Sequence, residues 1–113
     1  MSKKTAAFEF KLRPGQMLSR YYEVVEMLGS GWEGEVYLVR EKSTGIERTA
    51  KLFFPERNRG DRASTRYARK LNALRHCPIV IQYHNQMNIT LKGVPVTLLI
   101  SEFVEGELLS QFL

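Results

Sequence analysis

The sequence has 113 residues, of which 43% are hydrophobic and 26% charged, a composition typical of one small soluble domain. Such a short chain buries only about two-thirds of its unfolded surface, so we expect a partner or further sequence to cover its remaining apolar faces. No apolar run approaches the roughly 20 residues that cross a bilayer, and no signal peptide is visible, so we expect a cytoplasmic protein with no membrane partner. The single cysteine, Cys77, excludes an internal disulfide. The net charge of +5 is concentrated between Arg57 and Arg75, where any anionic partner should dock.

The first half of the chain predicts an extension and three strands. Residues 1–20 are an N-terminal extension with a turn at 11–15. Residues 22–28 and 34–39 are β-branched, aromatic or aliphatic with glutamates interleaved, a pattern typical of half-buried strands. A turn at 43–45 leads into a third strand at 46–54, which Pro55 ends.

The second half predicts one helix between strands. Asp61 can cap a helix that runs to about residue 75 and has an apolar face and a basic flank. The apolar face contains Ala63, Tyr67, Leu71 and Leu74, and the flank contains Arg62, Arg66 and Arg69. Pro78 breaks the helix, and two strands at 79–88 and 94–103 follow, joined by a turn at 92–93. Short connections favour antiparallel neighbours, so we expect an α+β fold, a five-stranded antiparallel sheet with one amphipathic helix.

A glycine-rich segment joins the first two predicted strands. Residues 29–36 have the spacing G-x-G-x-x-G-x-V, and the last glycine opens a strand rather than a helix. This context favours a hairpin-borne glycine loop over a dinucleotide-binding turn. Glycines let backbone N–H groups approach phosphate oxygens closely, although a glycine hairpin without a ligand is an open alternative.

Lys51 is the candidate cation for such a phosphate site. It follows Gly34 by 17 residues, within the apolar stretch Thr49-Ala50-Lys51-Leu52-Phe53. A buried lysine among apolar neighbours is costly without a counter-charge, so the alternative is an exposed lysine on the solvent side of the strand.

Taken in order, these features resemble the small N-terminal lobe of the eukaryotic-like serine/threonine protein kinases. The resemblance includes the pattern Leu71-x-x-Leu74-x-His76 and the segment Ile-Ser-Glu-Phe-Val-Glu-Gly at 100–106, and the opening at 12–25 is similar to bacterial members. It covers residues 12–113 and implies an N-lobe with its hinge over 21–107, followed over 108–113 by the truncated start of a C-lobe helix.

The resemblance implies an ATP site in which Lys51 is the catalytic lysine on the α- and β-phosphates. The residues that would cover the phosphates are Gly29, Ser30, Gly31 and Gly34. The residues that would enclose adenine and ribose are Val36, Thr49, Ser101, Glu102, Val104 and Glu107.

Each residue of the second group has an implied place. Val36 would cover the adenine ring, Thr49 replaces the family's usual alanine, and Ser101 takes the gatekeeper position. The backbones of Glu102 and Val104 would hydrogen-bond the adenine edge, with Glu107 near the ribose. An ordinary edge strand is the alternative for 102–104.

Two positions depart from the family. Its lysine normally pairs with a helix glutamate, but Tyr67 aligns with that position. The candidate replacements in a rearranged lobe are Glu47, Glu56 and Asp61. At the loop tip, Glu33 would repel phosphate.

The family's catalytic aspartate and its magnesium ligands follow the hinge and have no counterpart in these 113 residues. We therefore expect the chain alone, as a truncated or separately produced fragment, to be inactive, with Mg²⁺ bound only in the intact kinase. The expected partners are ATP, a C-terminal lobe, a protein substrate and, through the uncovered lobe interface, a second copy of the chain. His76 and His84 lack metal-ligand spacing, so both are interpreted as structural.

Two other functions stay open. Tyr67 and Glu33 suggest a non-catalytic, pseudokinase-like interaction module. A nucleic-acid binder would use the basic segment at 57–75, but this segment lacks interleaved aromatics apart from Tyr67, so we do not expect a nucleic-acid partner. The same flank is most often a solvated face and less often meets a phosphorylated loop or a regulatory partner.

Overall fold

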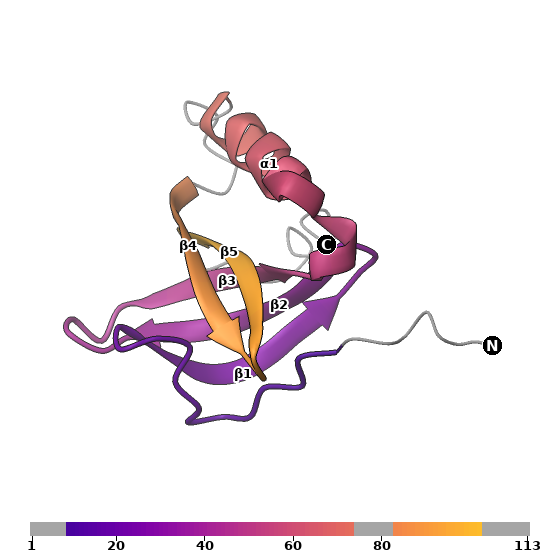
Figure 1. Ribbon diagram of the computed structural model, residues 1–113. Coiled ribbons are helices and arrows are strands. Elements are labelled where there is room, and N and C mark those ends of the chain that lie inside the picture. The colour runs from indigo at the N-terminus through magenta and orange to yellow at the C-terminus, as the bar shows by residue number, and fades with distance from the viewer. Residues whose placement is uncertain (1–8, 74–82, 103–113) are drawn as a thin grey trace.

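The computed structural model describes residues 9–73 and 83–102 of the chain, and it contains one sheet and one α-helix (Figure 1). The elements in chain order are β1 (Tyr22–Ser30), β2 (Gly34–Glu41), β3 (Glu47–Phe53), the 3₁₀ turns η2 (Pro55–Arg57) and η3 (Arg59–Asp61), α1 (Arg62–Ala73), β4 (Tyr83–Leu91) and β5 (Val94–Glu102).

All five strands belong to one antiparallel sheet with the order β1-β2-β3-β5-β4. The helix α1 lies over one face of this sheet, close to β4 and β5 (Figure 1). The predicted α+β architecture, five antiparallel strands with one helix, is therefore confirmed.

Short turns join β1 to β2, β2 to β3 and β4 to β5, and they explain the antiparallel pairing within these three pairs. In the turn between β4 and β5, Lys92 and Gly93 both have positive φ angles, 53° and 78°. Two such residues form the turn whose twist matches that of the flanking strands, and glycine adopts this conformation without steric cost. The Lys92-Gly93 pair thus sets the register of the hairpin.

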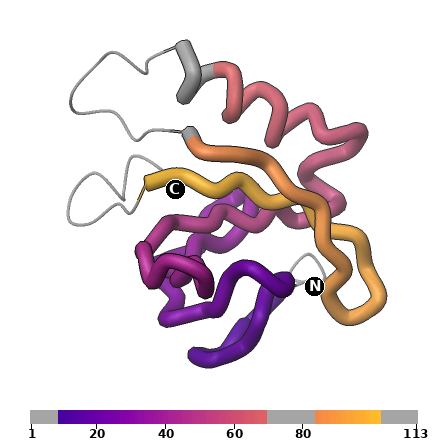
Figure 2. Tube along the Cα trace, turned by 90° about the vertical axis from the view of Figure 1, so that its left-hand side faces the viewer, coloured from indigo at the N-terminus to yellow at the C-terminus, as the bar shows by residue number. Residues whose placement is uncertain are grey.

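The face of the sheet opposite α1 carries the larger core. Side chains of all five strands meet there, and the N-terminal segment 10–18 packs over them (Figure 2). Phe10 is 1% exposed and stacks on Phe54, with ring centroids 5.4 Å apart. Leu12 and Leu18 are buried in the same cluster, so part of the extension belongs to the core.

Glu35 and Tyr37 of β2 fasten this N-terminal segment. The carboxylate of Glu35, 3% exposed, accepts hydrogen bonds from the backbone N–H groups of Phe10 (3.2 Å) and Lys11 (3.4 Å) and from the Tyr37 hydroxyl (2.6 Å). The Tyr37 oxygen in turn accepts a hydrogen bond from the N–H of Leu12 at 3.0 Å. Burial raises the pKa of Tyr37, and the bond to Glu35 adds to this shift. The expectation that residues 34–39 form a half-buried strand is wrong, because both faces of this strand are buried and the N-terminal segment covers Glu35.

The start of α1 differs from the predicted cap. Asp61 directly precedes the helix as expected, but its φ of 58° is left-handed and its carboxylate accepts a hydrogen bond from the Thr97 hydroxyl at 2.6 Å. The side-chain oxygen of Asn58 instead accepts the hydrogen bond of the Ser64 N–H at 2.9 Å. Asn58 therefore accepts the hydrogen bond of a backbone N–H in the first helical turn that has no partner within the helix. This is the capping function that the sequence predicted for Asp61.

Several predictions lie outside the described residues. They concern the helix end at 74–75 with Leu74, the residues His76, Cys77 and Pro78, the strand start at 79–82, and everything from residue 103 onward. Within the described parts, no helix is long and apolar enough to span a membrane.

Candidate functional site

The glycine loop is the short turn between β1 and β2. The Gly31 N–H donates a hydrogen bond to the Gly34 carbonyl at 2.9 Å, which closes the turn. Gly34 packs so tightly against β3 that an added Cβ would lie 1.9 Å from the Leu52 carbonyl oxygen. Any larger residue would push the two strands apart, so the third glycine of the spacing is required by close packing.

The other loop residues are more open. Gly29 pairs with Val36 just after a register shift in β1, and Ser30 and Gly31 are exposed. Gly34 is thus the loop glycine that the close approach of the β3 backbone requires.

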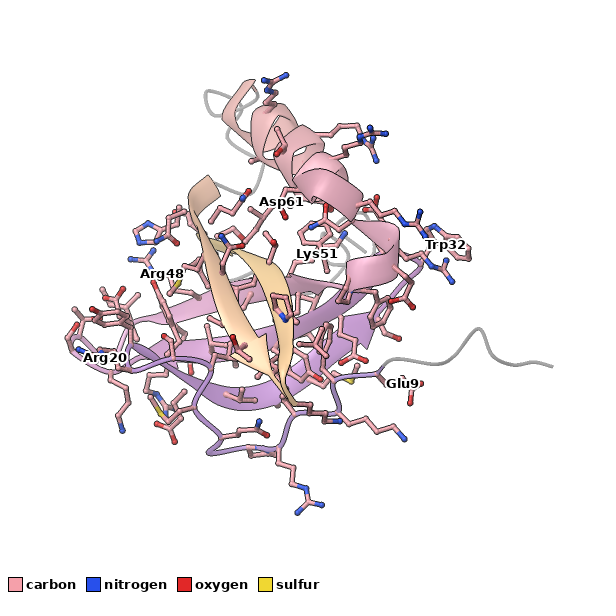
Figure 3. The ribbon with its side chains drawn as sticks, viewed as in Figure 1. Glu9, Arg20, Trp32, Arg48, Lys51 and Asp61 are labelled. Atoms are coloured by element: carbon pink, nitrogen blue, oxygen red, sulfur yellow. The ribbon has the colours of Figure 1, made fainter. Side chains whose placement is uncertain are left out.

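Lys51 lies on the same face of the sheet as α1 and beneath the end of the glycine loop. Its side chain is 1% exposed, and Figure 3 shows it between the sheet and the helix. Its ammonium Nζ lies 4.0 Å from the centroid of the Tyr67 ring of α1 and 5.4 Å from that of Phe53. The alternative of a lysine on the solvent side of its strand is therefore wrong.

Glu33 supplies a carboxylate to this buried lysine. Its Oε1 lies 3.6 Å from Lys51 Nζ, and its Oε2 lies 3.5 Å from Nη2 of Arg66 on α1. The loop-tip acid thus bridges a strand cation and a helix cation. Burial raises the pKa of Tyr67 to about 12, and the nearby charge of Glu33 adds to the shift.

The acids considered as replacements for the family's helix glutamate lie elsewhere. Glu47 pairs with Arg40 at 3.9 Å, Asp61 accepts from Thr97, and Glu56 is exposed in η2. The counter-charge instead comes from the loop, because the hairpin bends Glu33 over β3. Two cations flank the Glu33 carboxylate, and the repulsion between Glu33 and phosphate stays a prediction.

Four of the residues predicted around adenine lie in the described part of the chain, on the adjacent strands β2, β3 and β5. Val36 pairs with Lys51, and Thr49 pairs with Ser101, so the strand register places their side chains on the face that carries Lys51. Val36, Thr49 and Ser101 are fully buried in this lobe, whereas Glu102 is exposed. Val104 and Glu107 lie outside the described residues.

Sequence reasoning missed the cations that hold the loop tip. The guanidinium of Arg57 in η2 lies 3.0 Å from the ring centroid of Trp32, which is 73% exposed. Figure 3 shows Trp32 at the edge of the molecule, beside η2. The helical periodicity groups Arg66 with Arg62 and Arg69 in the basic flank, and it indicates no partner in the loop.

A metal centre does not emerge from the described parts of the chain. Residues 9–73 and 83–102 contain no group of three or more His, Cys, Asp or Glu side chains that could hold an ion. His84 is exposed on β4, and His76 lies outside the described residues.

Comparison with known proteins relates this fold to protein kinases. No protein-family profile and no curated protein matches the sequence. Two crystal structures of the Mycobacterium tuberculosis PknI kinase domain match with a TM-score of 0.60 at 25% and 27% identity, over 84% of this chain and 37% of theirs. A Plasmodium kinase domain shares the fold alone, with a TM-score of 0.65 and 19% identity over 83% of this chain and 27% of that one.

The chain therefore has the fold of the small N-terminal lobe of a protein kinase, as the sequence predicted. It spans little more than a third of the length of the PknI domain structures.

Proposed function

We propose that this chain is the ATP-binding small lobe of a serine/threonine protein kinase, in which Lys51 contacts the nucleotide phosphates beneath the glycine loop. The observation that supports this best is the burial of Lys51 on the helix-side face of the sheet, directly under the loop. A buried ammonium is costly to maintain, which favours a ligand-binding role over a structural one.

The charge of the site fits a phosphate ligand. Lys51 and Arg66 contribute two positive charges against the single carboxylate of Glu33, and Arg57 adds a third cation at the loop tip. An excess of positive charge beside a glycine turn favours a polyanion. When bound, ATP supplies the phosphoryl group, while the residues of this chain bind and orient its phosphates.

Phosphoryl transfer would need groups that the family carries on its large lobe. Magnesium ligands and the base that accepts the substrate proton lie there, so the proposed transfer requires a C-terminal lobe together with this one. We propose that the chain acts in the cytoplasm and that the intact kinase phosphorylates a protein substrate.

The test is a heteronuclear NMR titration of the 113-residue chain with ATP, which detects even weak binding residue by residue. We expect the largest shifts at Gly31, Gly34, Val36 and Lys51, and their loss in the Lys51→Met variant. Lys42→Met is the matched control, because Lys42 is exposed at the far end of β2. Adenosine, which has no phosphate, should shift the adenine-side residues and leave the loop unchanged.

Shifts confined to the arginines of α1, or no shifts at millimolar ATP, would refute nucleotide binding by this lobe. With a C-terminal lobe supplied, Lys51→Met should also abolish phosphoryl transfer, and unchanged transfer would overturn the role of Lys51.

A non-catalytic interaction module is the second candidate, and the Tyr67 ring against Lys51 favours it. In that case a helix tyrosine replaces the usual glutamate because nucleotide orientation is no longer needed. Isothermal titration calorimetry of a full-length form that includes the C-terminal lobe, with a magnesium–ATP analogue, separates the two: measurable magnesium-dependent heat supports the kinase, and its absence supports the module.

A further inference from the structure

The carboxylate of Glu33 joins three separate elements of the lobe. It starts from the glycine loop, reaches Lys51 Nζ on β3 at 3.6 Å, and reaches Arg66 Nη2 on α1 at 3.5 Å. The Glu33 side chain is 25% exposed, and that of Lys51 is 1% exposed. The ion pair with Lys51 is thus largely shielded from water. Charge interactions in such a shielded place are stronger than at an exposed surface.

The backbone of the loop is fixed on the same side. The Phe54 N–H donates a hydrogen bond to the Glu33 carbonyl at 2.8 Å, and the Trp32 ring lies against Arg57. Gly34 then packs on the Leu52 carbonyl. These contacts hold the loop where its carboxylate reaches the lysine.

We propose that Glu33 is the positioning residue for Lys51: the loop, rather than the helix, supplies the carboxylate that fixes the phosphate-binding ammonium. Tyr67 occupies the helix position and packs its ring against the ammonium without offering a charge. Arg66 of α1 pairs with the same carboxylate, so a movement of the helix would act on Lys51 through Glu33 of the loop. The effect on nucleotide binding rests on the proposed function, whereas the pairing itself is measurable without nucleotide.

The charges favour a positioning role over blockade of the site. A lone carboxylate under the loop would repel phosphate, but Glu33 lies between two cations, and the three groups together carry a charge of +1. Removing the carboxylate would leave Lys51 buried without this counter-charge, and a shifted or reoriented ammonium would bind phosphate less well.

The first experiment is a double-mutant cycle on equilibrium unfolding by urea, without nucleotide. Glu33→Gln should increase the unfolding equilibrium constant about tenfold in the natural background and have little effect in the Lys51→Met background. Glu26→Gln is the control, because Glu26 is exposed on β1. Equal effects of Glu33→Gln in both backgrounds would overturn the pairing.

The second experiment moves the carboxylate to the helix. Tyr67→Glu places an acid beside Lys51, where it should repel Glu33 in the natural background and replace it in Glu33→Gln. The cost of Tyr67→Glu should therefore be about tenfold smaller, as an unfolding equilibrium constant, in the Glu33→Gln background. Equal costs would contradict the inference. If the Tyr67→Glu chains do not fold, the Lys51 cycle decides.

The third readout is ATP affinity by NMR titration. Glu33→Gln should weaken binding severalfold, and the Glu33→Gln/Tyr67→Glu chain should recover it, a rescue that a purely structural residue would not give. Tighter binding by Glu33→Gln would identify the carboxylate as a blocking group and overturn the positioning role. If the natural chain binds no ATP, the proposed function fails while the unfolding cycle still decides the pairing.

Discussion

Glu33 and Glu35 are two positions apart in the chain, and their carboxylates bind groups on opposite faces of the sheet. Glu35 is 3% exposed and is surrounded by neutral donors, two backbone N–H groups and a tyrosine hydroxyl. Glu33 is partly exposed and is flanked by two cations, Lys51 and Arg66. The same residue type thus has two functions: Glu35 holds the N-terminal segment on one face, and Glu33 compensates the charge of Lys51 on the other.

The difference shows how a small lobe separates stability from binding. Neutral hydrogen bonds in a closed site stabilise the fold without attracting a ligand. Cationic side chains near an opening, in contrast, produce a positive potential that attracts a polyanion. We therefore expect substitutions on the N-terminal-segment face to change stability most, and those on the helix face to change binding and pH dependence.

Phe10→Ala should give the largest loss of stability. Phe10 is 1% exposed and stacks on Phe54, so its removal leaves a cavity under the N-terminal segment and should cost about 3 kcal/mol. Urea denaturation followed by circular dichroism measures this. Met17→Ala is the control, because Met17 is 40% exposed on the same segment. A loss equal to that of Met17→Ala would show that the segment is not part of the core in solution.

Glu35→Ala should follow, at about 2 kcal/mol, because it removes the carboxylate that accepts the buried hydrogen bonds of the Phe10 N–H and the Tyr37 hydroxyl. Glu35→Gln keeps an acceptor oxygen and should lose less. Hydrogen exchange of the Phe10 and Leu12 amides should accelerate in Glu35→Ala. Unchanged exchange there would contradict the fastening role and weaken the contrast with Glu33.

Tyr67 should make the helix face sensitive to alkali. Its pKa is raised from 10.0 to about 12 in the folded chain, so the folded state holds this proton more tightly than the unfolded state does. The stabilisation is present below pH 10 and is lost as the pH rises toward 12. Near-ultraviolet absorbance of tyrosinate should show a late step to which Tyr37 also contributes, and Tyr67→Phe should remove one tyrosine from it. If Tyr67→Phe instead removes absorbance that appears at the ordinary tyrosine pKa, the Tyr67 ring is not buried against Lys51.

Arg66→Gln should have the smallest effect on stability, below about 0.5 kcal/mol, because the Arg66 side chain is 73% exposed and its ion pair with Glu33 is screened. The effect should vanish in molar salt, since salt screens exposed pairs. Urea denaturation at low and high salt measures both. A large, salt-independent loss would mean that the pair is buried in solution.

Local patterns predicted most of the fold. The strand patterns of β1 and β2, the Lys92-Gly93 turn and the periodicity of α1 involve near neighbours in the chain, which is why they can be recognised without a structure. The family resemblance added the kinase lobe, which the structural comparison confirms. The roles assigned to the ATP-site residues stay predictions.

The sequence by itself determined the order in which the strands, the helix and the glycine hairpin follow one another along the chain, because propensity and turn chemistry act over a few residues. Only the tertiary structure decided that Glu33 is the partner of Lys51, that Asn58 rather than Asp61 caps α1, and that residues 10–18 complete the core. The ion pair and the core packing join residues far apart in the chain, and the cap depends on a left-handed turn at Asp61. Such choices follow from which groups the folded backbone brings within reach.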